Sequence, residues 1–165
     1  MPRILLPLFA ALLLAASPAL SQEPAPGGMD ANKTLVRRYL EILSGGALEK
    51  LDEVIAPDFV DRTPGASTQT RGPEAIRESQ RRARELFQDI RYTAEDLIAE
   101  GDRIAVRYTV RATRIGPGGG GKPVEVTGVT LFRVADGRIR EAWIINDQIE
   151  LFRQLGYTLL PPQNH

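Results

Sequence analysis

An acidic residue at the end of a predicted strand is the first candidate for chemistry in this sequence. The segment "REAWIINDQIE" (residues 140–150) has the two-residue period of a strand and reaches Asp147. Counted from Ile139, this period predicts that Asp147 shares a face with Ile145 and with Trp143, the only tryptophan. A carboxylate beside these apolar side chains would lose hydration, which disfavours its charged form and suits it to proton transfer.

Asp147 also fits a purely structural role. It directly precedes "QIELF", which has the pattern of a short helix, and Asp is a preferred N-cap residue. The residue pattern alone favours the cap slightly over a catalytic role. The two roles are compatible, so both stay open.

Several other side chains are candidates for a ligand site. Asp61 and Arg62 lie in the turn-rich segment after the second predicted helix, where a loop could reach over a pocket. A local contact between the two at the surface is the alternative, and such pairs stabilise little. The aromatic residues could line an apolar cavity, although each alone is more often plain core: Tyr39, Phe59, Tyr92, Tyr108, Phe132 and Trp143.

A glycine-rich segment resembles a nucleotide-binding loop but does not have its context. "GPGGGGKP" (residues 116–123) contains the G-x-x-x-x-G-K spacing. Pro123 stands where the hydroxyl that binds magnesium is needed, and a strand pattern follows instead of a helix. We therefore interpret the segment as a loop between two strands.

The predicted elements that position these residues are helices followed by hairpins. The first helix runs from Asp30 to the "SGG" at 44–46, a second short one stops before Pro57, and a third starts at Pro73. Four strands follow as two hairpins, the second of which turns at Asp136-Gly137. Three helices followed by an antiparallel meander indicate an α+β fold.

The N-terminal segment has the pattern of a cleavable secretory signal. Arg3 precedes an apolar run, and Ala19-Leu20-Ser21 has the small-x-small pattern of a cleavage site. The 165-residue chain then divides into a signal peptide (1–21), a linker (22–29), one domain (30–157) and a C-terminal tail (158–165). The mature protein is expected in the periplasm or outside the cell, and an uncleaved membrane anchor is the lesser alternative.

Charge and composition narrow the possible partners. Without Arg3 the net charge is near −1, which predicts no binding to nucleic acid and no membrane association of the mature form. The chain has no cysteine, and its single histidine is the last residue, His165. We therefore predict no metal site, because zinc, copper and iron sites in proteins depend on these residue types.

The order of these segments resembles a known family. "LVRRYLEILSGGALEKLDEVIAPDFVDRTPG", the run from "GPEAIRESQ" to "RATRIG", and "VEVTGVTLFRVADGRIREAWIINDQIELFRQLG" are similar to the SnoaL-like polyketide cyclases, or ester cyclases, of the NTF2-like superfamily. The resemblance implies a cone of three N-terminal helices packed on a curved antiparallel sheet around an apolar cavity. It also implies a possible homodimer.

The resemblance implies a site as well. Asp147 matches the aspartate that acts as general acid/base in the family's aldol cyclisation, which uses no cofactor, on a small apolar or carbonyl-bearing ligand. Trp143 and Ile145 would then shape the cavity wall, with Phe59, Asp61, Arg62, Tyr39 and Tyr108 as further ligand contacts. Family members often have His or Asn where this chain has Arg62, and the predicted domain contains no histidine. A non-catalytic module for ligand binding or dimerisation is therefore the alternative function.

Overall fold

The computed structural model describes residues 28–63, 71–116 and 120–158, which form an α+β fold. The predicted signal peptide lies outside these ranges, as do most of the linker and nearly all of the tail. The elements in chain order are α1 (Gly28–Leu43), the 3-10 turn η1 (Leu48–Lys50), α2 (Leu51–Val54), β1 (Ile55–Asp61), α3 (Gly72–Leu86), β2 (Phe87–Glu100), β3 (Arg103–Arg114), β4 (Lys122–Ala135), β5 (Arg138–Asn146) and α4 (Gln148–Gln154).

The first and third predicted helices are confirmed. α1 ends at Leu43, and Gly45 follows with a φ of 92°, the left-handed conformation that glycine adopts readily after a helix. α3 carries Pro73 in its first turn, where proline's missing N–H costs no hydrogen bond. No helix among the described residues is long and apolar enough to cross a membrane.

The sheet has five strands in the order β1-β5-β4-β3-β2. β2 to β5 form the predicted antiparallel meander, and the turn at Asp136-Gly137 has positive φ at both residues, as a tight hairpin turn requires. The prediction of only four strands was wrong, because β1 pairs with β5 in parallel. Pro57 lies within β1, which an edge strand tolerates because one of its sides makes no ladder hydrogen bonds.

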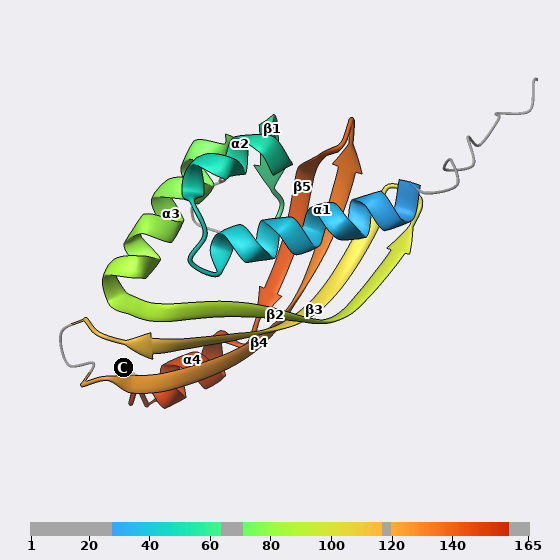
Figure 1. Ribbon diagram of the computed structural model, residues 1–165. Coiled ribbons are helices and arrows are strands. Elements are labelled where there is room, and N and C mark those ends of the chain that lie inside the picture. The colour runs from blue at the N-terminus through green and yellow to red at the C-terminus, as the bar shows by residue number, and fades with distance from the viewer. Residues whose placement is uncertain (1–27, 64–70, 117–119, 159–165) are drawn as a thin grey trace, which may run out of the picture.

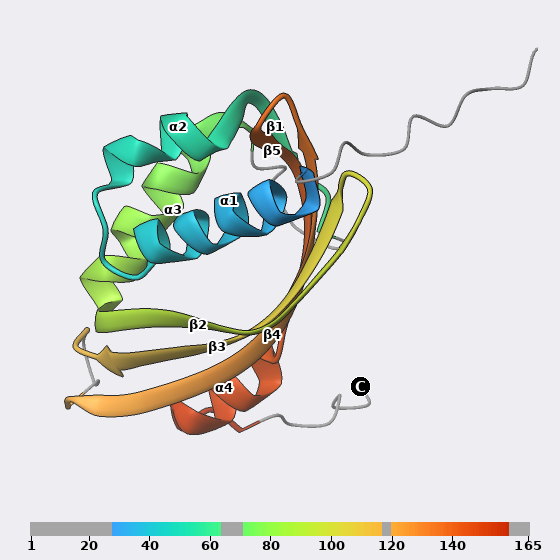
Figure 2. The same cartoon turned by 45° about the vertical axis from the view of Figure 1, so that its right-hand side comes forward.

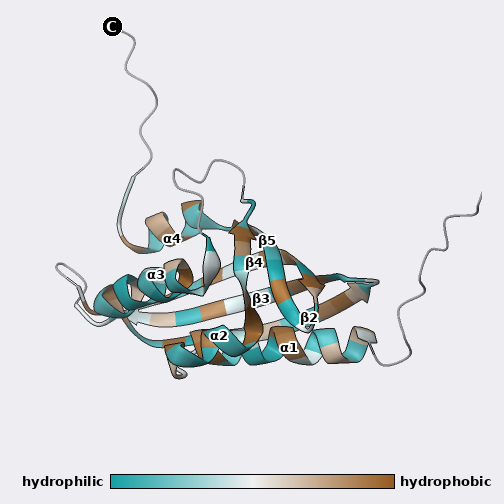
Figure 3. Ribbon diagram, turned by 90° about the horizontal axis from the view of Figure 1, so that it is seen from above, coloured by the Kyte–Doolittle hydropathy of each residue, from teal (hydrophilic) through white to brown (hydrophobic). Residues whose placement is uncertain are grey.

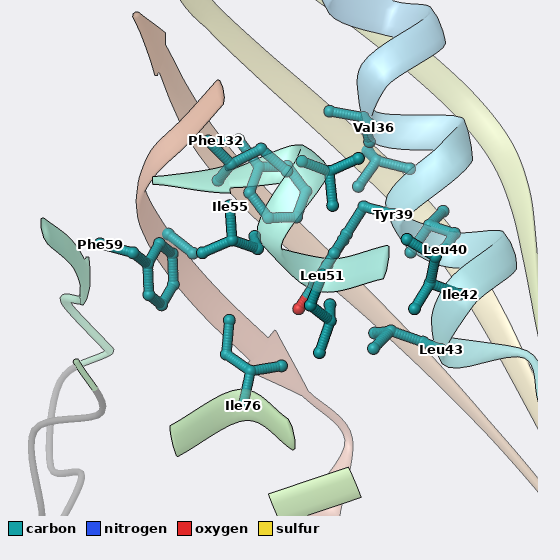
Figure 4. Packing of buried hydrophobic residues seen from close by; sticks show 14 of the residues in the cluster. Val36, Tyr39, Leu40, Ile42, Leu43, Leu51, Ile55, Phe59, Ile76 and Phe132 are labelled. Atoms are coloured by element: carbon teal, nitrogen blue, oxygen red, sulfur yellow. The ribbon is translucent and has the colours of Figure 1, made fainter. Parts of the chain in front are cut away.

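The sheet curves around the N-terminal helices. Figures 1 and 2 show α1, α2 and α3 on its concave side, with α4 next to β4, beyond the end of β5. Figure 3 shows hydrophobic and hydrophilic residues alternating along the strands, as expected for a sheet with one buried face. Figure 4 shows the core between the helices and the sheet, where Val36, Leu51, Ile55 and Phe132 are almost completely buried.

A β-bulge changes the alternation of side chains in β5. Arg133 pairs with Glu141 while Val134 pairs with Ile139, so Arg140 is an extra residue on β5. Ile139 and Ala142 are both buried, although an odd number of positions separates them. After the bulge, the even-numbered residues of β5 face the helices and the odd-numbered ones face outward.

Candidate functional site

An apolar cavity lies between the helices and the inner face of the sheet. It encloses about 350 Å³, a size typical of small-molecule sites. Leu40 and Leu43 of α1, Ala83 of α3 and Val126 of β4 contribute to its apolar wall. Within the described part of the chain, none of the residues that line this cavity is Asp, Glu, His, Lys or Arg. A neutral, largely apolar ligand suits such a wall, because burying an unpaired charge is costly.

Three polar side chains form a hydrogen-bonded chain in this wall. The Tyr108 hydroxyl donates to Oδ1 of Asn146 at 2.6 Å, and the Thr130 hydroxyl donates to the Tyr108 oxygen at 3.3 Å. The three residues come from β3, β5 and β4, so sheet pairing brings them together. Asn146 is exposed as well as lining the cavity, which places its amide where solvent and cavity meet.

The tyrosines of the cavity are neutral hydrogen-bonding groups. Burial raises the pKa of Tyr39, Tyr92 and Tyr108, because the phenolate would lose its hydration. The Tyr108 pKa is raised by burial and lowered in part by its hydrogen bond with Thr130. These hydroxyls therefore keep their protons at neutral pH and do not act as bases.

Asp147 caps α4. Its Oδ1 accepts a hydrogen bond from the backbone N–H of Glu150 at 2.9 Å, so the structural alternative predicted from the sequence is confirmed. The residue is exposed and does not line the cavity, although its neighbours Asn146 and Gln148 do. The catalytic role of Asp147 stays a prediction.

Trp143 and Ile145 lie on the outer face of the sheet, so the expectation that they form the cavity wall is corrected. The bulge at Arg140 turns the odd-numbered residues of β5 outward. The Arg103 guanidinium lies over the Trp143 ring, 5.9 Å from its centroid, and Ile145 is 70% exposed. Ile144 takes the inward position between them.

The remaining predicted ligand contacts divide between the cavity and its surroundings. Tyr39 and Tyr108 line the cavity, and the Tyr39 ring meets Phe132 edge-to-face at a centroid distance of 5.6 Å. Phe59 is buried in the core beside Ile55 and Ile76 and does not line the cavity (Figure 4).

Asp61 and Arg62 also lie outside the cavity wall. An Asp61 oxygen accepts a hydrogen bond from the Thr63 backbone N–H at 2.8 Å, which holds the end of β1 in a turn. Arg62 pairs with Glu141 at 2.9 Å on the outer side of the sheet, so the expected local Asp61–Arg62 contact is replaced by a pair across strands. Neither residue lines the cavity.

Sequence reasoning missed five polar residues of the cavity wall: Ser79, Gln80, Thr130, Asn146 and Gln148. Their spacing carries no recognisable motif, because they come from different elements. Gly128 in the middle of β4 was an available signal, since a glycine inside a strand often marks a close approach of neighbouring atoms. Among the described residues, no group of three or more His, Cys, Asp or Glu side chains is arranged to hold a metal ion.

Comparison with known proteins identifies the family. The family model described as SnoaL-like polyketide cyclase matches residues 33–155. The chain belongs to this family. Membership indicates a cofactor-free, cyclase-type function and agrees with the curved sheet and the apolar cavity. The comparison with curated proteins gave no match.

Several solved structures share the fold. IdmH, a putative polyketide cyclase from Streptomyces antibioticus, is 32% identical, with a TM-score of 0.68 over 76% of this chain and 99% of that chain. TsrD from Streptomyces laurentii is 27% identical, with a TM-score of 0.68 over 77% of this chain and 96% of that chain. A putative SnoaL-like polyketide cyclase from Jannaschia sp. CCS1 is 23% identical, with a TM-score of 0.68 over 81% of this chain and 94% of that chain. This likeness shows the fold alone.

The cap at Asp147 predicts how substitutions there change stability. Asp147→Ala should lower the free energy of unfolding by about 1 kcal/mol, because the Glu150 N–H loses its acceptor. Asp147→Ser should change the free energy of unfolding by only about a few tenths of a kcal/mol, since serine also caps well. Urea unfolding of both variants measures the difference, and equal stabilities would contradict the cap.

The Glu141 ion pairs predict a pH dependence of stability. Hydrogen bonds from Arg133 at 2.8 Å and from Arg62 at 2.9 Å lower the pKa of Glu141 from 4.5 to about 2. Because the pKa of Glu141 is lower in the folded protein than in the unfolded chain, its ionised form stabilises the fold at a pH above the unfolded-state pKa. This contribution is lost as the pH falls from about 4.5 towards 2. Glu141→Gln should therefore destabilise by about 1–2 kcal/mol at pH 7 and by less at pH 3.

Chemical denaturation at both pH values tests this dependence. Glu78→Gln is a matched control, because Glu78 and its partner Arg82 form an exposed pair within one helix. The control should change stability little at either pH. A Glu141→Gln effect that is the same at pH 7 and pH 3 would contradict the assignment.

Proposed function

We propose that the protein binds a small, neutral, carbonyl-bearing compound in the cavity and acts on it by cofactor-independent proton transfer, as in aldol cyclisation or isomerisation. The apolar cavity with one hydrogen-bonded polar chain in its wall carries this proposal. Family membership over residues 33–155 supports the cyclase type of reaction.

The reaction begins at the carbon next to the carbonyl. A base removes a proton there, and the electron pair moves towards the carbonyl oxygen to give an enolate. In a cyclisation, the enolate carbon forms a bond to a second carbonyl carbon of the same molecule. The resulting alkoxide takes up a proton, which returns the base to its starting state.

Asp147 is the proposed acid/base in this reaction. It lies between Asn146 and Gln148, both of which line the cavity. To face the ligand, its carboxylate must leave the backbone N–H of Glu150, at a cost of about 1 kcal/mol. This cost is small beside the 10²–10⁴-fold that general acid/base catalysis typically contributes, which corresponds to roughly 3–5 kcal/mol.

Ligand binding without catalysis is the second candidate function. The observation that favours it is the absence of any ionisable side chain other than tyrosine from the described cavity wall. Under this proposal the ligand stabilises the protein, and no product forms.

Exchange of protons next to a carbonyl separates the two functions without knowledge of the natural substrate. In D₂O, 2-acetylnaphthalene should exchange its methyl protons for deuterium faster with the protein than without it, as followed by proton NMR. Asp147→Asn and Asp147→Ser both keep a capping side chain and remove the carboxylate. Each should lower the exchange rate at least about 100-fold while ketone binding is unchanged.

Each contrary result has a distinct meaning. Binding of the ketone with no exchange in the wild type would favour ligand binding without catalysis. Wild-type exchange in Asp147→Asn would show that Asp147 is not the base. Wild-type exchange in Asp147→Ser would lead to the same conclusion.

Export and self-association are further proposals. Export is supported by the signal-like pattern of residues 1–21, and mass spectrometry of the mature N-terminus tests it. A homodimer is supported by exposed apolar side chains on the outer sheet face, where Ile98 and Ile145 are each 70% exposed and Val129 is 45% exposed. A sedimentation-velocity run showing only monomer across the concentration range would contradict the homodimer.

A further inference from the structure

Tyr108, Gly128 and Asn146 form one row across three neighbouring strands. Tyr108 of β3 pairs with Gly128 of β4, which in turn pairs with Asn146 of β5. The Tyr108 hydroxyl reaches across Gly128 to Oδ1 of Asn146, at 2.6 Å. The two side chains therefore meet over the middle strand instead of packing against a side chain of that strand.

Gly128 leaves the space for this hydrogen bond. A Cβ on Gly128 would lie 2.3 Å from Asn146 Oδ1 and 2.8 Å from the Tyr108 hydroxyl oxygen, both far inside van der Waals contact. Gly128 is not among the residues with positive φ, so its backbone conformation suits any residue. The glycine is thus explained by the space above it and not by its conformational freedom.

The hydrogen-bonded chain fixes the Asn146 amide. Its Oδ1 is occupied by the Tyr108 hydroxyl, which the Thr130 hydroxyl orients in turn. The amide is planar, so an occupied Oδ1 also sets the direction of Nδ2. No hydrogen bond from Nδ2 to another described residue is present, while Asn146 lines the cavity. Consecutive hydrogen bonds polarise one another, which strengthens the N–H groups as donors.

We propose that Nδ2 of Asn146 donates a hydrogen bond to the carbonyl oxygen of the ligand, with Tyr108, Thr130 and Gly128 as its positioning residues. The inference rests on the proposed function only in that the ligand carries a carbonyl. An N–H group donates and a carbonyl oxygen accepts, so the pair is chemically matched. A donor fixed in advance also stabilises the negative charge that grows on this oxygen as an enolate forms.

A pair of probes that differ in one group tests the inference. The dissociation constants of 2-acetylnaphthalene and 2-ethylnaphthalene are measured by isothermal titration, and their ratio isolates the contribution of the carbonyl. Asn146→Asp keeps the shape and the acceptor for Tyr108 but replaces the donor with a carboxylate oxygen. This variant and Asn146→Ala should each lower the relative preference for the ketone about tenfold.

The positioning residues should have smaller effects of the same kind. Tyr108→Phe and Gly128→Ala leave Asn146 in place but release its amide, so each should lower the preference about threefold. The infrared carbonyl band of the bound ketone should also shift to higher frequency in all four variants, which a purely structural role would not produce. Tyr108→Phe keeps the test decisive if Gly128→Ala does not fold.

Two matched controls should leave the ratio unchanged. Asn32→Asp makes the same amide-to-carboxylate change on α1, away from the cavity wall, and Gly28→Ala adds a Cβ where no atom lies within 4 Å. An unchanged ratio and band position in both Asn146 variants would overturn the inference. If the wild-type protein exchanges the ketone's protons but shows no preference for the ketone over 2-ethylnaphthalene, the proposed function stands and this inference fails. If it prefers the ketone but exchanges no protons, this inference stands and the proposed proton transfer fails.

Discussion

The extra residue at Arg140 determines which side chains of β5 can meet a ligand. β4 keeps a regular alternation along this stretch, whereas β5 gains one residue against it, so the inward positions of β5 move from odd to even numbers. Ile144 and Asn146 therefore line the cavity, and Trp143 and Ile145 cover the outer face. The direction of Asn146, and with it the polar chain of the cavity, depends on this bulge.

The second constraint is the neutrality of the cavity wall. In an apolar surrounding, a charged group needs a partner, and the described cavity wall offers hydroxyls and amides in place of charges. Burial keeps the tyrosine hydroxyls protonated, so the wall can orient a carbonyl but does not itself remove a proton at neutral pH. Binding and proton transfer are thus assigned to different residues, with Asn146 inside the wall and Asp147 at the start of α4.

Much of the fold follows from local sequence signals. Pro73 and the "SGG" after α1 mark helix ends, and Asp136-Gly137 forms the predicted hairpin turn because both residues adopt positive φ. β1 was missed because Pro57 was interpreted only as the end of a helix. Its strand conformation comes from pairing with β5, more than seventy residues further along the chain.

The site was less predictable than the fold for the same reason. Tyr39 and Tyr108 were found because large aromatic residues tend to line apolar cavities. The side of the sheet on which Trp143 lies could not be derived from the two-residue period of a strand. A bulge depends on how two strands pair, so the sequence of one strand alone does not reveal it. Asn146 likewise gains its proposed role only from Tyr108 and Gly128 on neighbouring strands.

A crystal structure of the protein with 2-acetylnaphthalene tests the central claim most directly. The account predicts the naphthalene rings in the cavity between α1, α3 and the sheet, with the carbonyl oxygen about 2.7–3.2 Å from Nδ2 of Asn146. The Tyr108–Asn146 hydrogen bond should remain in place. A ketone bound in the cavity with its oxygen directed away from Asn146, or bound on the outer face beside Trp143, would contradict the account.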